Sequence, residues 1–182
     1  MKKHQMLCLW GLIILVALMS ANTAQGKAIT DMFGRKFSIA DRPQKVYSAS
    51  PPMTNLLYAI DPSMLAGLTV PIREYEKPYL RKEMLSLPLL GGWYGQGNTP
   101  NIEMILKIKP ELIIIQKFGS AFHTKTNETV MKTMPAPVVA VTLTTVFDYP
   151  TALAFLGRLL GRESRAGELA AYAKKTIADM KV

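Results

Sequence analysis

Short apolar runs alternate along the chain with stretches in which apolar residues recur at helical spacing. Runs rich in Val, Ile and Leu predict strands at residues 45–49, 65–70, 88–90, 112–115 and 138–141. Helical spacing predicts helices at residues 52–60, 79–85, 101–108, 127–134, 149–160 and 163–182. Residues 112–115 are wholly apolar, which is typical of a parallel strand covered on both faces. The alternation predicts an α/β fold with a doubly wound, mostly parallel sheet.

Two further segments lie outside this alternation. Residues 29–39 predict a small hairpin that turns at Phe33-Gly34-Arg35. The long C-terminal helix carries an apolar stripe made of Ala170, Ala173, Ile177 and Met180. A stripe of this kind usually packs on another element. Either the helix folds back on the sheet, or its partner lies elsewhere and several stripe residues stay exposed.

The N-terminus has the order of a secretory signal peptide. Lys2 and Lys3 give a basic start, residues 6–21 form an apolar run, and small or polar residues follow up to residue 26. We predict cleavage before Lys27, with cleavage after Ala24 as the alternative. The competing interpretation is an uncleaved anchor, but spanning a bilayer takes about 20 apolar residues, and this run is shorter. We therefore expect residues 1–26 to be a signal peptide and the protein to be exported.

Removal of residues 1–26 changes the composition. The single cysteine, Cys8, is lost, so the remaining chain forms no disulfide and depends on an ordinary apolar core. The formal charge falls from +9 to +7 with the loss of Lys2 and Lys3. That charge is either a solvated surface or an attraction for an anionic small ligand. Nucleic acid is not expected as a partner, because no basic run is interleaved with aromatic residues.

The sequence lacks the motifs of common enzyme classes. It contains no nucleophile elbow, Walker loop, zincin helix motif or dinucleotide glycine pattern. After the predicted cleavage one histidine, His123, remains, which excludes a metal site built from several histidines of this chain. We expect a protein that is not an enzyme, with no catalytic residues, no metal site and no cofactor.

Three ordered motifs resemble one family of transport proteins. Pro43 to Pro51 is a proline, a basic residue and a strand that ends in Ser-Ala-Ser-Pro, and a helix follows at Thr54. Residues 101–114 combine Asn-Ile-Glu, a helix, Lys109-Pro110 and an apolar strand. Asp31 and Gly34-Arg35 match a first hairpin. Together these motifs resemble the helical-backbone periplasmic binding proteins, which are the iron-siderophore, haem and cobalamin receptors of ABC importers.

The resemblance implies a domain organisation and a function. Such receptors have two α/β lobes bridged by one long helix, and they deliver a metal chelate to an inner-membrane permease. Residues 27–161 resemble the N-terminal ligand-binding lobe and residues 162–182 the start of the bridging helix, so we expect an incomplete chain without a second lobe. Asn55 stands where the family has glutamate. The alternative function is a secreted one-lobe adaptor that binds a protein partner.

Open α/β sheets bind ligands at the carboxyl ends of their strands. This rule gives the predicted ligand-binding residues, which are Ser50, Pro51, Arg73, Trp93, Tyr94, Gln116 and Lys117. Arg73 and Lys117, with the nearby Arg81 and Lys82, suit an anionic metal chelate through charge-assisted hydrogen bonds. The resemblance assigns a different role to Glu103, because the matching glutamate of cobalamin-binding members meets an arginine of the permease during docking.

Overall fold

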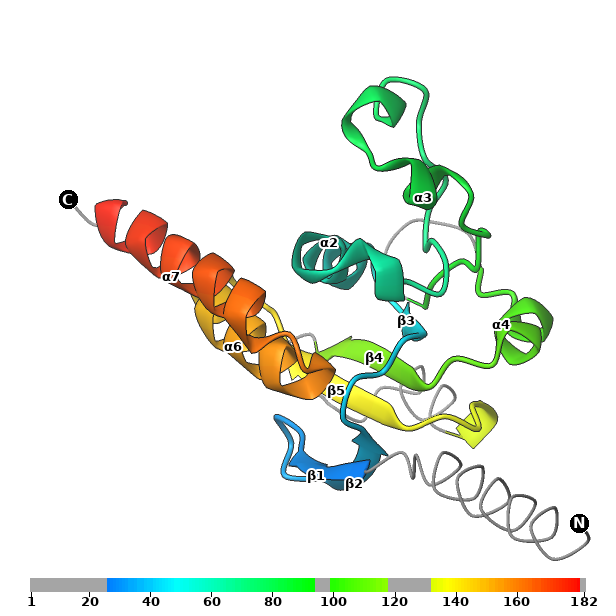
Figure 1. Cartoon of the computed structure of the whole chain (residues 1–182), viewed down its shortest axis with the longest axis horizontal. Coiled ribbons are helices and arrows are strands. Elements are labelled where there is room, and N and C mark those ends of the chain that lie inside the picture. The colour runs from blue at the N-terminus through cyan, green and yellow to red at the C-terminus, as the bar shows by residue number, and fades with distance from the viewer. Residues whose placement is uncertain (1–25, 94–98, 118–131, 181–182) are drawn as a thin grey trace, which may run out of the picture.

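The computed structural model describes residues 26–93, 99–117 and 132–180 (Figure 1). The predicted signal peptide therefore lies outside the described residues, as does most of the helix predicted at 127–134. Within the described residues, no helix combines the length and the apolar character that crossing a membrane requires.

The predicted N-terminal hairpin is present. Strand β1 (Gly26–Thr30) pairs antiparallel with β2 (Lys36–Ala40). The buried carboxylate of Asp31 holds the turn, because it accepts hydrogen bonds from the backbone N–H groups of Phe33 and Arg35 and from the Arg35 guanidinium. Gly34 has a φ of 77°, a conformation that side chains other than glycine rarely adopt.

The central sheet is parallel, as predicted. It contains β3 (Val46–Ser48), β4 (Leu112–Lys117) and β5 (Val138–Thr142), in the order β3-β4-β5. The predicted strands at 65–70 and 88–90 are reduced to single parallel bridges, Val46 with Leu65 and Leu68 with Leu89. Pro88 has no N–H group to extend the second bridge. These bridges lie on the side of β3 that faces away from β4. The segments that follow β3 in sequence therefore extend the sheet in one direction, and β4 and β5 extend it in the other.

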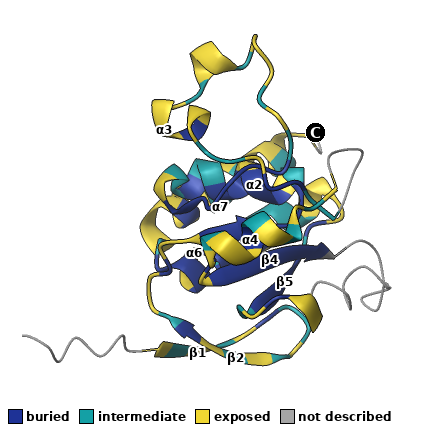
Figure 2. Ribbon diagram, turned by 90° about the vertical axis from the view of Figure 1, so that its right-hand side faces the viewer, coloured by how far each residue is buried: buried dark blue, intermediate teal, exposed yellow. Residues whose placement is uncertain are grey.

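Helices cover both faces of the sheet. The larger apolar cluster joins one sheet face to α2 (Pro51–Ile60), α6 (Tyr149–Leu160) and α7 (Glu163–Asp179). The second cluster joins the opposite face to α4 (Ile102–Ile108). Side chains of β4 alternate between the two clusters, as the two-residue period of a strand requires. Figure 2 shows β4 and β5 as buried and much of the hairpin and of the segment around α3 as exposed.

Short helical turns connect the larger elements. Three 3₁₀ turns are η1 (Pro62–Met64), η2 (Lys77–Tyr79) and η3 (Val146–Asp148). The helix predicted at 79–85 is shorter, as α3 (Lys82–Leu85) preceded by η2. This segment, residues 71–85, leaves the sheet edge and returns to it, and it forms the upper part of the molecule in Figure 1.

Helices α6 and α7 form a tight antiparallel pair (Figure 1). Gly161 ends α6 with a φ of 63°, and Ala166 of α7 packs directly against Gly157 of α6. The predicted stripe on α7 is mostly half-buried, because Ala170 and Ala173 pack against the larger cluster. Exposure is concentrated in Tyr172 and Met180, at 72% and 59%.

An apolar groove runs between α7, α2 and the start of α6. Its volume is about 380 Å³, and it is lined by Leu56, Ala59, Val146, Tyr149, Leu153, Leu169, Tyr172, Ala173, Thr176, Ile177 and Met180. The stripe of α7 therefore folds back on the domain but leaves one side without apolar cover within the described residues.

Candidate functional site

Strands β3 and β4 lie side by side, and the order of the sheet reverses between them. The chain leaves their carboxyl ends in opposite directions, which opens space at that edge. Ser50 follows β3, and Gln116 is near the end of β4. The Ser50 hydroxyl donates to the Gln116 side-chain oxygen at 2.9 Å, and the Gln116 amide donates to the Leu143 carbonyl. Both side chains are almost fully buried, so they join three segments beneath the surface of this edge.

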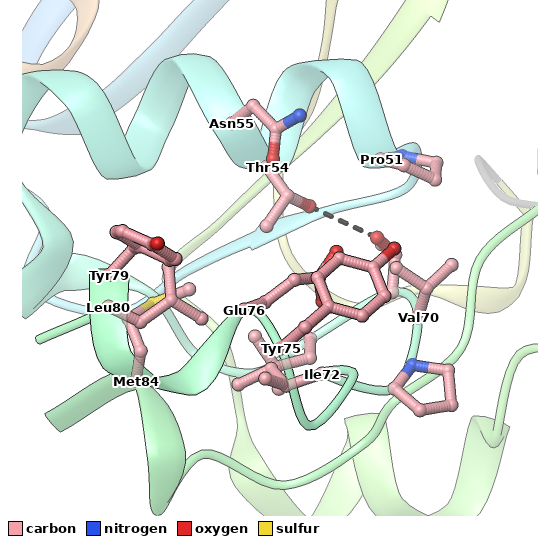
Figure 3. Close-up of a pocket in the computed structure, with 13 residues that line it drawn as sticks. Pro51, Thr54, Asn55, Val70, Ile72, Tyr75, Glu76, Tyr79, Leu80 and Met84 are labelled. Atoms are coloured by element: carbon pink, nitrogen blue, oxygen red, sulfur yellow. Dashed lines mark hydrogen bonds between the residues drawn. The ribbon is translucent and has the colours of Figure 1, made fainter. Parts of the chain in front are cut away.

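The hydrogen-bonded network continues into the first turn of α2. The Thr54 hydroxyl lies 3.1 Å from the Ser50 carbonyl oxygen and 3.3 Å from the Thr69 hydroxyl, the contact drawn as a dashed line in Figure 3. Thr54 and Thr69 are both buried. Because unpaired polar groups are costly in a protein interior, this chain of contacts fixes the start of α2 against the segment that follows residue 68.

The aromatic residues at this edge are also fixed by the backbone. Trp93 donates its backbone N–H to the Ala49 carbonyl at 3.0 Å, and its ring meets the Tyr47 ring edge-on at 5.8 Å between centroids. The Tyr47 hydroxyl donates to the Gly91 carbonyl at 2.8 Å. Burial raises the pKa of the Tyr47 phenol well above its usual range, so this group stays a neutral donor. Trp93 is half-buried in a loop at the edge of the sheet.

A pocket of about 430 Å³ opens beside this network, between α2 and the segment at 71–85 (Figure 3). Its lining is mainly apolar or aromatic, from Pro51, Leu68, Val70, Pro71, Ile72, Tyr75, Tyr79, Leu80 and Met84. Four polar residues, Thr54, Asn55, Thr69 and Glu76, interrupt this lining. Ligand pockets in proteins typically combine this range of volume, an apolar lining and a few polar groups.

Local hydrogen bonds hold the outer wall of the pocket. The Glu76 carboxylate accepts the Arg73 backbone N–H at 2.7 Å, which closes the turn that carries Tyr75. The Arg73 guanidinium donates to the Tyr75 hydroxyl at 2.6 Å and lies over the Tyr75 ring. Tyr75 and Tyr79 remain exposed, at 64% and 86%. The outer wall therefore carries two solvent-exposed tyrosine rings.

The predicted ligand-binding residues fall into three groups. Pro51 lines the pocket, and Arg73 lies beside it as the partner of Tyr75. Ser50, Gln116 and Trp93 lie at the same sheet edge, the first two in the buried network. Lys117 ends β4, and Tyr94 lies outside the described residues. Their role in ligand binding stays a prediction.

Most of the residues that line the pocket were not among the predicted ligand-binding residues. Thr54, Asn55, Thr69 and the tyrosines of the outer wall come from a helix and from an irregular segment, not from strand ends. The available signal was the concentration of Pro71, Pro78 and two tyrosines between residues 71 and 79, within a region too irregular for a periodicity argument.

Glu103 lies away from this pocket, in the first turn of α4, and it is exposed. The Asn101 side chain caps the same helix by accepting the Met104 backbone N–H at 3.0 Å. A carboxylate at this position complements the positive end of the helix. Among the described residues, histidine, cysteine and acidic side chains do not gather in any group of three that could hold a metal ion.

This architecture is shared with known proteins. Residues 70–181 match a family profile described as periplasmic binding protein. An ABC transporter solute binding protein from Sulfurospirillum deleyianum superimposes with a TM-score of 0.73 and 28% identity, over 84% of this chain and 47% of that chain.

Two more distant solved structures share the fold. Staphylococcus aureus SirA complexed with staphyloferrin B has a TM-score of 0.59 and 22% identity, over 84% of this chain and 48% of that one. Haemophilus influenzae MolA bound to molybdate has a TM-score of 0.61 and 17% identity, over 84% and 53%. This chain thus spans about half the length of these proteins. A search of curated protein sequences found no match.

Proposed function

Because this chain belongs to the periplasmic binding protein family, we propose that it is the substrate-binding component of an ABC importer for a metal chelate. The ligand class is that of an iron-siderophore, haem or cobalamin. The protein acts in the periplasm and delivers its ligand to a permease in the inner membrane. It carries out no catalysis and uses no cofactor.

The pocket beside α2 is the observation that carries this proposal. It lies next to the point where the sheet order reverses, and its volume and aromatic wall suit part of a flat organic ligand. The staphyloferrin B complex of SirA supports a siderophore-type ligand, and MolA supports an anionic one. The guanidinium of Arg73 contacts the hydroxyl of Tyr75, a lining residue, and adds a positive charge for an anionic chelate.

The affinity of this lobe alone is expected to be weak. High affinity for a small ligand requires most of its surface to be buried, which takes walls on more than one side. One lobe offers α2 on one side of the pocket and the segment at 71–85 on the other, and the tyrosines at the mouth remain largely exposed.

A titration panel tests the ligand proposal. Isothermal titration calorimetry is run with haem, cobalamin, molybdate, ferric staphyloferrin B and ferric petrobactin, on the purified protein and on two variants. Asn55→Arg places a long, charged side chain at the pocket. Thr151→Arg introduces the same residue at an exposed position of α6. We expect one chelate to bind, Asn55→Arg to abolish its binding, and Thr151→Arg to leave it unchanged. Absence of heat with every ligand would refute the proposal.

Glu103 is the proposed contact with the permease. It is an exposed carboxylate on α4, on the sheet face opposite α2. Binding to the detergent-solubilised permease should weaken for Glu103→Gln and stay unchanged for Glu83→Gln, which removes another exposed acid. Equal binding by both variants would assign docking to another surface.

The apolar groove favours a second candidate function, a secreted one-lobe adaptor that binds a protein partner. Tyr172 and Met180 leave much of their apolar surface in water along this groove, and such patches mark sites of association. A chelate that binds with dependence on Asn55 supports the receptor, whereas a stoichiometric protein partner with no chelate binding supports the adaptor.

A further inference from the structure

A second cleft lies at the opposite end of α2 from Pro51. Its volume is about 390 Å³, and it is lined by the last turn of α2, by Asp61, by Arg81 at the start of α3 and by Arg165 of α7. The pocket described above takes residues from the first half of α2, up to Asn55, whereas the cleft begins at Tyr58. The two linings have no residue in common, so the cleft is a separate site.

The negative groups that line this cleft are already paired. The Asp61 carboxylate accepts from the Ser63 backbone N–H at 3.0 Å and from the Ser63 hydroxyl at 2.6 Å. Its other oxygen accepts from Arg162 Nε at 2.7 Å. The carbonyl of Ala59, near the negative end of the α2 dipole, accepts from Arg165 Nε at 3.3 Å. These acceptors are thus engaged by protein donors.

Several donors that line the cleft have no acceptor among the described residues. The Arg81 guanidinium has neither a hydrogen-bond nor an ion-pair partner there. Of the Arg81 donors only the backbone N–H is used, donating to the Tyr58 hydroxyl at 3.2 Å. That contact uses the Tyr58 oxygen and leaves its proton available. Arg165 uses Nε and Nη1, the latter on Glu168 at 3.1 Å, and leaves Nη2 available.

The charges show the same imbalance. Asp61 is offset by Arg162, and Arg165 is offset by Glu168, while Arg81 is offset by no described residue. A cleft with paired acceptors, spare donors and one uncompensated cation is complementary to a group that only accepts hydrogen bonds and carries negative charge.

We propose that this cleft binds a small organic anion, with a carboxylate or phosphate group held between Arg81 and Arg165. Guanidinium groups match both anions because their paired N–H donors reach two oxygens at once. The cleft is several times larger than the roughly 30 Å³ that one water molecule occupies in the liquid, so there is room for an organic body against Ala59 and Pro62. The site does not depend on the proposed transport function.

NMR titration of the purified protein with citrate and, separately, with inorganic phosphate tests the proposal. We expect saturable shifts at Tyr58 and Ala59, and citrate should bind more tightly than phosphate if the organic body contributes. Arg81→Gln should weaken binding by about tenfold or more, because it removes a charge-assisted contact. The matched control is Lys82→Gln, which removes an exposed cation from the next residue, outside the cleft lining.

Three results would overturn the proposal: no saturable shift with either anion, equal weakening by Arg81→Gln and Lys82→Gln, or shifts confined to the pocket beside Pro51. Equal weakening would mean that the overall positive charge alone attracts the anion. Both variants should remain folded, because the Arg81 side chain has no hydrogen-bond partner among the described residues. Unfolding curves for each variant check this.

Discussion

At the scale of single residues, Gln116 is the residue on which the geometry of the candidate site depends most. Its side chain bonds both to Ser50, which precedes α2, and to Leu143, which follows β5. The residue is 3% exposed, so water cannot replace either bond. It was predicted as a ligand contact, and the structure shows that it holds two segments of the sheet edge together.

Gln116→Leu should therefore destabilise the fold. The change keeps the volume but leaves the Ser50 hydroxyl and the Leu143 carbonyl unpaired in the interior, at about 1–3 kcal/mol for each unsatisfied group. Urea unfolding followed by circular dichroism should show a total loss of about 2–6 kcal/mol. The control is Gln44→Leu at an exposed position, with an expected change under about 0.5 kcal/mol. A similar small change for Gln116→Leu would contradict the role of the network.

Asp61 gives a prediction for pH dependence. Burial acts to raise the pKa of its carboxyl, but hydrogen bonds from Ser63 and Arg162 outweigh this effect and hold the pKa below its usual value of 3.8. A depressed pKa stabilises the folded state while the carboxylate is ionised, and that stability is lost as pH falls through the folded-state pKa. The contribution is fully present above about pH 5, beyond the unfolded-state range.

The Asp61→Asn variant measures this contribution. At pH 7 it should be less stable than the natural protein by no more than about 1 kcal/mol, because the ion pair is partly exposed. The difference should shrink as the pH is lowered below about 4, where the natural carboxylate takes up a proton. Melting temperatures for both proteins across this range provide the test, and a pH-independent difference would assign the effect to packing.

At the scale of elements, the α6–α7 pair depends on one close approach. A Cβ atom at Gly157 would lie 2.7 Å from the Cβ of Ala166 and 3.3 Å from the Cα of Glu163. Contacts this short require the two helices to move apart, because the opposing atoms belong to the backbone or lie next to it. The pair forms one wall of the larger apolar cluster, so a shift at this point would reach the core.

Substitution of two glycines by alanine should give effects of opposite sign. Gly157→Ala should destabilise by about 1–3 kcal/mol through overpacking, despite the better helix propensity of alanine. Gly167→Ala, on α7 with open space around it, should stabilise by up to about 1 kcal/mol. Chemical denaturation of both variants checks the pair. Stabilisation by Gly157→Ala would mean that the helices separate at little cost.

The elements that the sequence predicted well are those whose pattern reflects burial on a regular backbone. The apolar runs at 112–115 and 138–141 gave β4 and β5, and helical spacing gave α2, α4 and α6 with boundaries within a residue or so. The segments at 65–70 and 88–90 have strand-like composition, but they pair only through single bridges, and Pro88 has no N–H group with which to extend one of them. Most of the pocket lining was missed for a related reason, because residues 71–78 follow no period.

At the scale of the whole molecule, the domain leaves one apolar surface without described cover. The groove beside α7 contains the exposed rings and methyl groups of Tyr172 and Met180. Burial of apolar surface contributes about 25 cal/mol per Å², so two copies gain free energy by covering this groove for each other. The charged residues on the neighbouring face of α7 form two internal ion pairs, Arg165 with Glu168 and Lys175 with Asp179, and do not oppose such contact.

The protein should therefore self-associate as its concentration rises. Sedimentation equilibrium should show a reversible increase in mass, and Tyr172→Lys should reduce it by placing a charge in the groove. Leu85→Lys serves as the control, since Leu85 is exposed at 44% on α3 and does not line the groove. If the mass remains that of a monomer at the highest concentration, exposure of the groove to water does not drive self-association.

The most direct test of the central claim is the position of the ligand. Crystals of the protein soaked with haem or ferric staphyloferrin B, measured at the iron absorption edge, locate the metal by its anomalous signal. Binding at the reversal point of the sheet predicts an iron peak at the pocket between α2 and the segment at 71–85, near Thr69 and Tyr75. A peak elsewhere on the lobe, or no peak with a chelate that binds in solution, would contradict the assignment of this pocket as the ligand site.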